Sequence, residues 1–372
     1  MIKLLVVDDS ALIRKLLGQV FAAEPDFEVQ FARNGTEALD QVRAFEPDVV
    51  TLDIHMPHMD GLECLDRIMI ERPCRVVMVS SLTADGAEAT LEALRLGAVD
   101  FVAKPQGAVS LRMNDFAPAL VEKVRAAARA KLRSSLRLKE RVRHRIGRMR
   151  TVRPRTVLRE RAEPAPLPAA DDGMEPVRHD ALRDGLVLVG TSTGGPPALE
   201  ALLTPLPANF SWPILIAQHM PAGFTGPLAH RLDGLCALRV TEVVQPVALR
   251  AGFVYIGRGD ADLIVSRRSA GLVALAAPAQ AGYPWHPSAD RLVRSAMEHL
   301  PASSLIGILM TGMGYDGAEA MALLRDRGGR TIAESEETAV VWGMPGELVK
   351  ANGADWVLPL PRIADRLQRL VF

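Results

Sequence analysis

Cysteine is scarce in this 372-residue sequence, and its three examples are scattered at Cys64, Cys74 and Cys236 without the spacing of metal ligands. We interpret them as buried thiols of a protein kept in a reducing compartment. Long apolar runs are also lacking: none approaches the roughly 18 residues of a transmembrane helix, so membrane insertion is not expected. Acidic residues at positions 8 and 9 come too early for a secretory signal peptide. The predicted location is therefore cytoplasmic.

Net charge is absent too, because 44 basic residues balance 44 acidic ones. The distribution along the chain is nevertheless uneven. Between Val121 and Arg161 stand 16 basic and 3 acidic residues, and residues 162–184 are rich in Pro, Ala and Asp with little apolar periodicity. Such a stretch is typical of a linker. With about 150 residues per domain as a guide, we expect one domain at 1–125, a linker at 126–184 and a second domain at 185–372.

The first domain alternates short apolar runs with amphipathic stretches such as residues 12–21 and 87–96, which predict helices. This alternation favours a doubly wound parallel sheet, in which sites form at the carboxyl ends of the strands. The predicted strands are Leu4–Val7, Val29–Phe31, Val49–Leu52, Val76–Val79 and Phe101–Ala103.

Polar groups stand at the ends of these strands. Asp8 and Asp9 follow the first strand, Asp53 follows the third, and Ser80 and Lys104 follow two others. Three clustered carboxylates repel one another unless a cation neutralises them, and all-oxygen ligands favour Mg²⁺. A carboxylate, a metal, a hydroxyl and a lysine together suit phosphoryl transfer onto an aspartate. The alternative is that each acid merely caps the helix after its strand.

Residues 1–125 resemble the receiver domains of response regulators. The resemblance implies that Asp53 is phosphorylated and that Asp8 and Asp9 belong to an acidic pocket for Mg²⁺, with the backbone carbonyl of His55 as a further ligand. It also implies that Ser80 and Lys104 contact the phosphoryl group. The stretches that carry it are VVDDSALIRK, DVVTLDIHMPHMDGLECL, MVSSLT and LGAVDFVAKP.

In the second domain, the buried-strand pattern LVLVG at 186–190 leads into TSTGG and a helix predicted from Pro196 to Leu203. Ser192 thus sits on a tight strand-to-helix turn, in a literal G-x-S-x-G. Glycines leave the serine hydroxyl exposed there, and the helix N-terminus offers free N–H groups to a developing oxyanion. A glycine-rich phosphate loop explains the same residues equally well.

Two further strand ends favour the nucleophile. His219 closes the apolar run PILIAQHM, and Asp316 lies in a Gly-rich loop before a helix that starts near Ala318. Ser192, His219 and Asp316 therefore meet at one edge of a second parallel α/β sheet, where His219 could deprotonate the serine and Asp316 orient the imidazole. Taken singly, His219 could be a core histidine and Asp316 a helix cap. The order Ser, His, Asp differs from that of α/β-hydrolases, chymotrypsin and subtilisin.

About residues 186–360 resemble the chemotaxis methylesterases, which are protein-glutamate methylesterases and glutamine deamidases. By this resemblance Ser192 is the nucleophile, His219 the base and Asp316 its partner, and the backbone N–H groups of Thr193 and Met313 are candidates for an oxyanion hole. Two positions depart from expectation: Tyr315 replaces a smaller polar residue and Thr191 a small apolar one. The matching stretches are VGTSTGGPPAL, AQHMPAGFT, HPSADRL, ILMTGMGYDGA and VVWGMPGE.

The two resemblances imply a phosphorylation-activated enzyme of chemotaxis. Its substrates would be γ-methyl esters of glutamate on chemoreceptors and, in some members, glutamine amides. A chemotaxis histidine kinase would donate the phosphoryl group, Mg²⁺ would serve the receiver, and hydrolysis would need no cofactor. The receiver would cover the active-site mouth until it is phosphorylated.

Other interpretations of the sequence are weaker. A nucleic-acid-binding response regulator would use the Arg-rich stretch, but we find no helix-turn-helix pattern and no aromatics interleaved with the basic run. A catalytically dead adaptor conflicts with three filled catalytic positions. The basic run itself predicts a solvated helix extension and tether, with binding to acidic surfaces as the alternative. Residues 253–277 are expected to form a rim beside the site, with a hairpin that turns at residues 269–271. Glu334, Glu336 and Glu337 are expected in a solvated loop.

Overall fold

In the computed structural model of the protein, the described residues are 1–81, 83–104, 109–132 and 185–371. Most of the predicted linker, residues 126–184, therefore lies outside the described residues. The part that is described continues the last helix of the N-terminal domain, which runs to Arg129.

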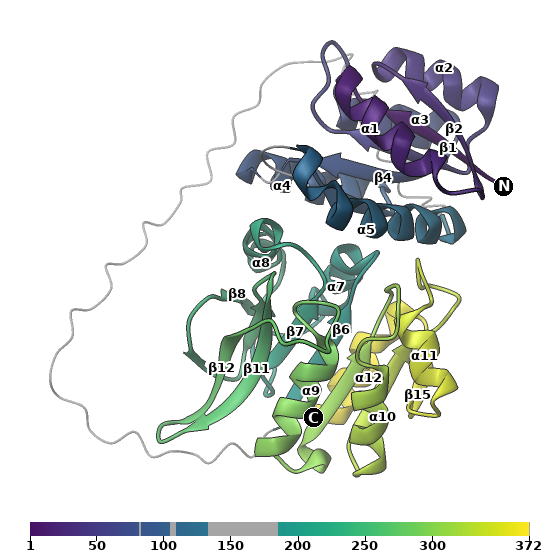
Figure 1. Ribbon diagram of the computed structural model, residues 1–372. Coiled ribbons are helices and arrows are strands. Elements are labelled where there is room, and N and C mark those ends of the chain that lie inside the picture. The colour runs from purple at the N-terminus through teal and green to yellow at the C-terminus, as the bar shows by residue number, and fades with distance from the viewer. Residues whose placement is uncertain (82, 105–108, 133–184, 372) are drawn as a thin grey trace, which may run out of the picture. The chain divides into compact units, whose positions relative to one another are not determined.

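The N-terminal domain is a five-stranded parallel sheet in the order β2-β1-β3-β4-β5 (Figure 1). Every predicted strand is present, and each extends the predicted apolar run by at least one residue. The central strand β3 is buried along its whole length, as expected for a sheet covered on both faces. The strands are β1 (Ile2–Val7), β2 (Phe27–Ala32), β3 (Val49–Asp53), β4 (Arg75–Ser80) and β5 (Asp100–Ala103).

Five helices complete this domain. Helices α1 and α5 contact each other, while α3 contacts both α2 and α4, which gives one helical layer on each face of the sheet. Four of these helices have a polar N-cap residue whose side chain accepts a hydrogen bond from a first-turn N–H group. The N-caps are Ser10, Asn34, Asp60 and Thr83. The helices are α1 (Ala11–Ala22), α2 (Gly35–Phe45), α3 (Gly61–Glu71), α4 (Ala84–Leu96) and α5 (Val109–Arg129).

The C-terminal domain is built on a seven-stranded parallel sheet in the order β15-β14-β13-β6-β7-β10-β8. The chain first adds β7 on one side of β6 and later adds β13 on the other side of β6. The two sides of β6 thus meet at a topological switch point, the usual place for a site in such sheets. The strands are β6 (Leu186–Thr191), β7 (Ile214–Gln218), β8 (Arg239–Val243), β10 (Phe253–Gly257), β13 (Leu305–Leu309), β14 (Arg330–Glu334) and β15 (Trp356–Leu358).

Helices cover both faces of this sheet, so the predicted pair of doubly wound parallel-sheet domains is confirmed. On one face α10 contacts α9 and α11, and on the other α7 contacts α8 and α12. The helices are α7 (Gly195–Leu203), α8 (Ala222–Leu235), α9 (Ala289–His299), α10 (Ala318–Asp326), α11 (Met344–Lys350) and α12 (Leu360–Val371), with a short 3₁₀ turn at Ala302–Ser304.

The predicted hairpin is also present. Strands β11 (Ala261–Arg268) and β12 (Gly271–Pro278) pair antiparallel, and β9 (Val247–Ala248) joins β12. The expectation that this whole region is a rim was partly wrong, because Phe253–Gly257 forms β10 inside the main sheet. The hairpin packs on α9, where the N–H of Val265 donates to the Ser295 hydroxyl at 3.0 Å. This packing brings the start of β11 to the N-terminus of α9. Among the described residues, no helix combines the length and apolar character needed to cross a membrane.

Candidate functional site

The N-terminal domain gathers three aspartates at the carboxyl ends of neighbouring strands. Asp8 and Asp9 follow β1, and Asp53 ends β3, which pairs directly with β1. One carboxylate oxygen from each lies within 4.8 Å of the others. Asp8 and Asp53 are buried, whereas Asp9 is exposed. The sheet topology therefore brings the three predicted acids together, as the strand-end argument requires.

This acidic group suits a hard divalent cation. The buried Oδ2 of Asp8 forms an ion pair with Lys104, whose Nζ lies 3.0 Å away. The same Nζ lies 2.8 Å from Asp53 Oδ2. The donor set of three clustered carboxylates is all oxygen and fits Mg²⁺, which prefers carboxylate, carbonyl and water ligands.

Two other predicted groups adjoin Asp53 in different ways. The N–H of His55 donates to Asp53 Oδ1 at 3.3 Å, which places the His55 peptide beside the carboxylate. Ser80 stands at the end of β4, but its buried hydroxyl donates to the carbonyl of Gly86 at 3.1 Å. Ser80 would therefore have to rotate before its hydroxyl could contact a group on Asp53.

Burial decides the electrostatics of Asp53. Loss of hydration raises the pKa of this carboxyl above its ordinary value, because the opposing effect of the Lys104 ammonium is smaller and the Asp8 charge adds to the rise. The Lys104 ammonium thus only partly compensates the charge of the buried Asp53 carboxylate.

In the C-terminal domain, Ser192 occupies the turn between β6 and α7. Its N–H donates to the Thr311 carbonyl at 3.0 Å, and its own carbonyl accepts from Gly195 N at 2.8 Å. Gly194 adopts a φ of +76°, which residues with a side chain rarely adopt. The loop after β13 approaches so closely that a Cβ on Gly312 would lie 2.8 Å from Ser192 Cβ. Tight backbone packing thus fixes the serine on a sharp corner, with its side chain half-buried.

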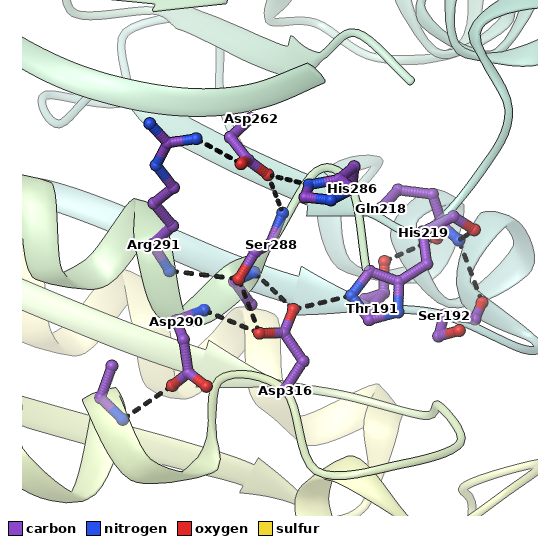
Figure 2. A network of polar contacts seen from close by, with 12 residues as sticks. Thr191, Ser192, Gln218, His219, Asp262, His286, Ser288, Asp290, Arg291 and Asp316 are labelled. Atoms are coloured by element: carbon purple, nitrogen blue, oxygen red, sulfur yellow. Dashed lines mark hydrogen bonds and ion pairs between the residues drawn. The ribbon is translucent and has the colours of Figure 1, made fainter. Parts of the chain in front are cut away.

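His219 follows β7, and its side chain is held by Asp316, which follows β13. The imidazole Nε2 lies 2.8 Å from Asp316 Oδ2. Since an ionised carboxylate only accepts hydrogen bonds, Nε2 carries a proton, and in the neutral imidazole the lone pair is then on Nδ1. That Nδ1 is buried and has no partner among the described residues. In Figure 2 the ring lies between Asp316 and Ser192.

Asp316 receives donors on both oxygens. Besides His219, Oδ2 accepts from Ala289 N at 2.6 Å, while Oδ1 accepts from the Ser288 hydroxyl at 2.8 Å and from Asp290 N at 3.1 Å. Burial alone would raise the pKa of Asp316, but the hydrogen bonds from His219 and the α9 N-terminus outweigh it and hold the pKa below its ordinary value. Asp316 therefore stays an anion and keeps His219 in one tautomer.

The two oxyanion-hole candidates come from two different loops. Thr193 follows Ser192 directly, and Met313 lies in the loop after β13. Among the hydrogen bonds of the described residues, none is donated by either N–H. Both N–H groups are thus available to a ligand.

Gln218 supports the serine turn and was not singled out from the sequence. The Thr191 hydroxyl donates to Gln218 Oε1 at 2.6 Å, which turns the amide so that its Nε2 donates to the Ser192 carbonyl at 3.1 Å. The unexpected threonine at position 191 thus orients a glutamine that anchors the turn. Adjacency to His219 was the available signal for Gln218.

Aromatic rings adjoin the imidazole. Trp285, which was also not singled out, lies parallel to His219 with 5.7 Å between ring centroids. Tyr315, the other departure from the expected pattern, is 60% exposed and meets Trp285 edge-on at 5.0 Å. The tyrosine therefore extends an aromatic surface beside the site and displaces none of its polar groups.

One expectation is corrected by the structure. Glu334 was expected with Glu336 and Glu337 in a solvated loop, but it ends β14 and is fully buried. Its Oε2 accepts from Thr311 N at 2.9 Å. Glu334 therefore braces the residue that accepts the Ser192 N–H.

Family models match both domains of the chain. Residues 4–114 match the response regulator receiver domain and residues 187–367 match CheB methylesterase. The chain is 56% identical over 370 residues to protein-glutamate methylesterase/protein-glutamine glutaminase 2 of Rhodopseudomonas palustris, covering 98% of this chain and 96% of that one. It is 50% identical to protein-glutamate methylesterase/protein-glutamine glutaminase 3 of Rhodospirillum rubrum, covering 99% and 95%.

A solved structure gives a third comparison. The catalytic domain of Thermotoga maritima CheB methylesterase is 37% identical, with a TM-score of 0.49, and the match covers 50% of this chain and 99% of that one. The curated relatives span nearly the whole chain at 50% identity or more. The chain therefore belongs to the CheB methylesterase family, in the form that joins a response regulator receiver domain to the methylesterase domain.

Proposed function

We propose that this chain is a phosphorylation-activated protein-glutamate methylesterase that hydrolyses glutamate γ-methyl esters on chemoreceptors. The observation that carries the proposal is the placement of His219, with Nε2 bound to Asp316 and an unpartnered Nδ1 on the side of Ser192. The relatives' names supply the substrate class, and the side-chain geometry supports the reaction type.

Acylation begins at Ser192. Its Oγ attacks the ester carbonyl carbon while His219 Nδ1 accepts the hydroxyl proton, and the carbonyl oxygen becomes an oxyanion. The imidazolium that forms is stabilised by Asp316. The free N–H groups of Thr193 and Met313 are proposed to bind the oxyanion.

Collapse of this intermediate breaks the bond to the methoxy oxygen. His219 returns its proton to that oxygen, methanol leaves, and a glutamyl ester of Ser192 remains. A water molecule then attacks the acyl carbon as Nδ1 takes its proton, and return of the proton to Ser192 Oγ releases the glutamate side chain. A glutamine amide follows the same course with ammonia as the leaving group, which matches the second activity in the relatives' names. We expect hydrolysis to need no cofactor.

The receiver domain is proposed to accept a phosphoryl group on Asp53 from a chemotaxis histidine kinase. Asp8, Asp9, Asp53 and the His55 carbonyl would hold Mg²⁺, which offsets negative charge around the phosphoryl oxygens when bound. Lys104, already paired with Asp53, would contact the phosphoryl group, and Ser80 would do so after rotation of its hydroxyl.

Regulation follows from joining the two domains in one chain. We propose a receiver domain at 1–125, a linker at 126–184 and a methylesterase domain at 185–372, with the unphosphorylated receiver limiting access to Ser192. Phosphorylation would shift the population toward the accessible state. We expect no partnership with nucleic acid, and a cytoplasmic location.

Methanol release from methylated chemoreceptors tests the proposal. Ser192→Ala should lower the rate by roughly 10⁴-fold or more, because it removes the nucleophile, and His219→Ala should cost about as much without adding to it. Circular dichroism should show both variants folded. Turnover near wild type in folded Ser192→Ala would exclude this assignment.

A further inference from the structure

Two buried carboxylates lie on opposite sides of the segment that leads into α9. Asp262, at the start of β11, accepts from Ser288 N at 2.8 Å and from His286 Nδ1 at 3.0 Å, and it also pairs with Arg291. Asp316, on the other side, accepts from the Ser288 hydroxyl. Figure 2 shows Ser288 between these two carboxylates. Asp262 thus fixes the backbone of Ser288, and the Ser288 side chain donates to Asp316.

Ser288 is completely buried, and its hydroxyl has two partners. It donates to Asp316 Oδ1 at 2.8 Å and accepts from Arg291 N at 3.3 Å, which makes it the N-cap of α9. Capping requires only the acceptor role. The donated hydrogen bond is therefore a second function of the same atom, directed at the carboxylate that holds His219.

We propose that Ser288 is a positioning residue for hydrolysis: its hydroxyl fixes the rotation of the Asp316 carboxylate and thereby the orientation of His219. This inference rests on the proposed function. Donors on both oxygens of Asp316 restrain the carboxylate about its Cβ–Cγ bond. Without the hydroxyl, Oδ1 retains the longer bond from Asp290 N at 3.1 Å, and Oδ2 is less well directed toward His219 Nε2.

Asp262 is the anchor of this arrangement. It is fully buried, and its bond to Ser288 N sets the position from which the hydroxyl reaches Asp316. The β11–β12 hairpin thus contributes to the site from outside the seven-stranded sheet, through α9.

The test compares three substitutions of Ser288 in the full-length protein by methanol release from methylated chemoreceptors. Ser288→Ala and Ser288→Gly both remove the hydroxyl, and each should lower kcat by about 10- to 100-fold, the range for a lost hydrogen bond to a charged group. KM should change by less than about twofold, since a fully buried side chain cannot touch substrate. Ser288→Thr keeps a hydroxyl and should recover most of kcat.

Stability separates positioning from capping. Glycine is nearly as good an N-cap as serine and alanine is poor, so a capping role alone would rank the stabilities with alanine lowest and leave kcat unchanged. Positioning predicts equal kcat losses for alanine and glycine, whatever their stabilities. Ser295→Ala is the matched control, because Ser295 is a buried serine of α9 that bonds Val265 and Leu292 instead. Its kcat should stay near wild type.

Wild-type kcat in folded Ser288→Gly, or a folded Ser288→Thr as slow as the glycine variant, would overturn the inference. With Ser192→Ala inactive, either result removes the positioning role and leaves the proposed function standing. Activity in Ser192→Ala would instead remove the proposed function itself.

Discussion

Asp53 in the receiver domain and Asp316 in the methylesterase domain are both buried aspartates at the carboxyl end of a parallel strand, 2% and 3% exposed. Their surroundings differ sharply. Asp53 is paired with Lys104 and accepts one long hydrogen bond from the His55 N–H. Asp316 accepts four hydrogen bonds, three of them from the N-terminus of α9.

The difference appears in the pKa of each group. Burial raises the pKa of Asp53, whereas hydrogen bonds overcome burial and lower the pKa of Asp316. An aspartate that is to be chemically modified benefits from a poorly compensated charge, and one that must remain an anion benefits from saturation with donors. The same residue type at the same kind of strand end therefore suits two roles.

The largest expected effect comes from a substitution of Asp316, the aspartate that accepts four hydrogen bonds. Asp316→Asn should lower methyl ester hydrolysis by about 10⁴-fold, because the amide NH₂ cannot accept from His219 Nε2–H and favours the tautomer that lacks a lone pair on Nδ1. Asp290→Asn, which keeps its N–H bond to Asp316, is the control and should retain most activity. Initial rates of methanol release decide the matter, and a loss under tenfold in folded Asp316→Asn would contradict the assigned role.

The reacting groups of both sites could be predicted from the sequence because of one geometric rule. Parallel strands have short apolar runs as their sequence pattern, and their carboxyl ends meet at one edge of the sheet. Asp8 and Asp53 could therefore be grouped in one domain, and Ser192, His219 and Asp316 in the other, from the sequence alone. The roles of these residues came from the family resemblance. Strand pairing order and side-chain rotamers were not needed for the grouping.

The supporting residues could not be predicted in the same way. Asp262 holds Ser288, and Ser288 donates to Asp316, because the β11–β12 hairpin packs on α9. No local period in the sequence encodes this long-range arrangement. Glu334 was misjudged because a cluster of three glutamates has the composition of a solvated loop. Its burial depends on pairing between β13 and β14, which places it against Thr311 N.

The second prediction concerns Asp53, whose charge Lys104 compensates only in part. Asp53→Asn should abolish phosphorylation by a small acyl phosphate, and chelation of Mg²⁺ should do the same to the wild type. Basal ester hydrolysis should not change, since Asp53 belongs to the other domain, but stimulation by the donor, expected to be about tenfold or more, should vanish. Mass spectrometry of the treated protein locates the phosphoryl group, and methanol release measures the stimulation. A phosphoryl group on Asp8 or Asp9 would show that the wrong aspartate had been chosen.

Removing the receiver domain altogether is expected to raise the rate by no more than phosphorylation does. Contacts between domains of one chain are usually modest and polar, so inhibition should amount to only a few kcal/mol. The fragment 185–372 should hydrolyse ester about tenfold or more faster than the unphosphorylated chain and should not respond to donor. The chain carrying Asp53→Asn, given donor, is the matched low-activity control. A folded fragment no faster than this control would mean that the receiver activates the enzyme instead of restraining it.

The smallest effect concerns acid stability and compares Asp316 with its neighbour Asp290. A carboxyl whose folded pKa is lowered contributes stability that is fully present above its ordinary pKa of about 4 and is lost as pH falls through the folded value. Asp316 is such a group. Burial raises the pKa of Asp290, so the sign is reversed: its contribution is greatest at low pH and declines as pH rises through the folded pKa.

Two variants test the opposite pH dependences of stability expected from Asp316 and Asp290. From pH 6 to pH 3, the wild type should lose about 1–2 kcal/mol of its stability advantage over Asp316→Asn, the scale of hydrogen bonds to a charged group. Over the same range it should gain relative to Asp290→Asn. Urea unfolding followed by tryptophan fluorescence isolates this domain, because all four tryptophans, Trp212, Trp285, Trp342 and Trp356, lie beyond residue 185. Parallel pH slopes for the two variants would show that the pKa values of Asp316 and Asp290 are not shifted in opposite directions. The argument that hydrogen bonds outweigh burial at Asp316 would then lose its physical basis.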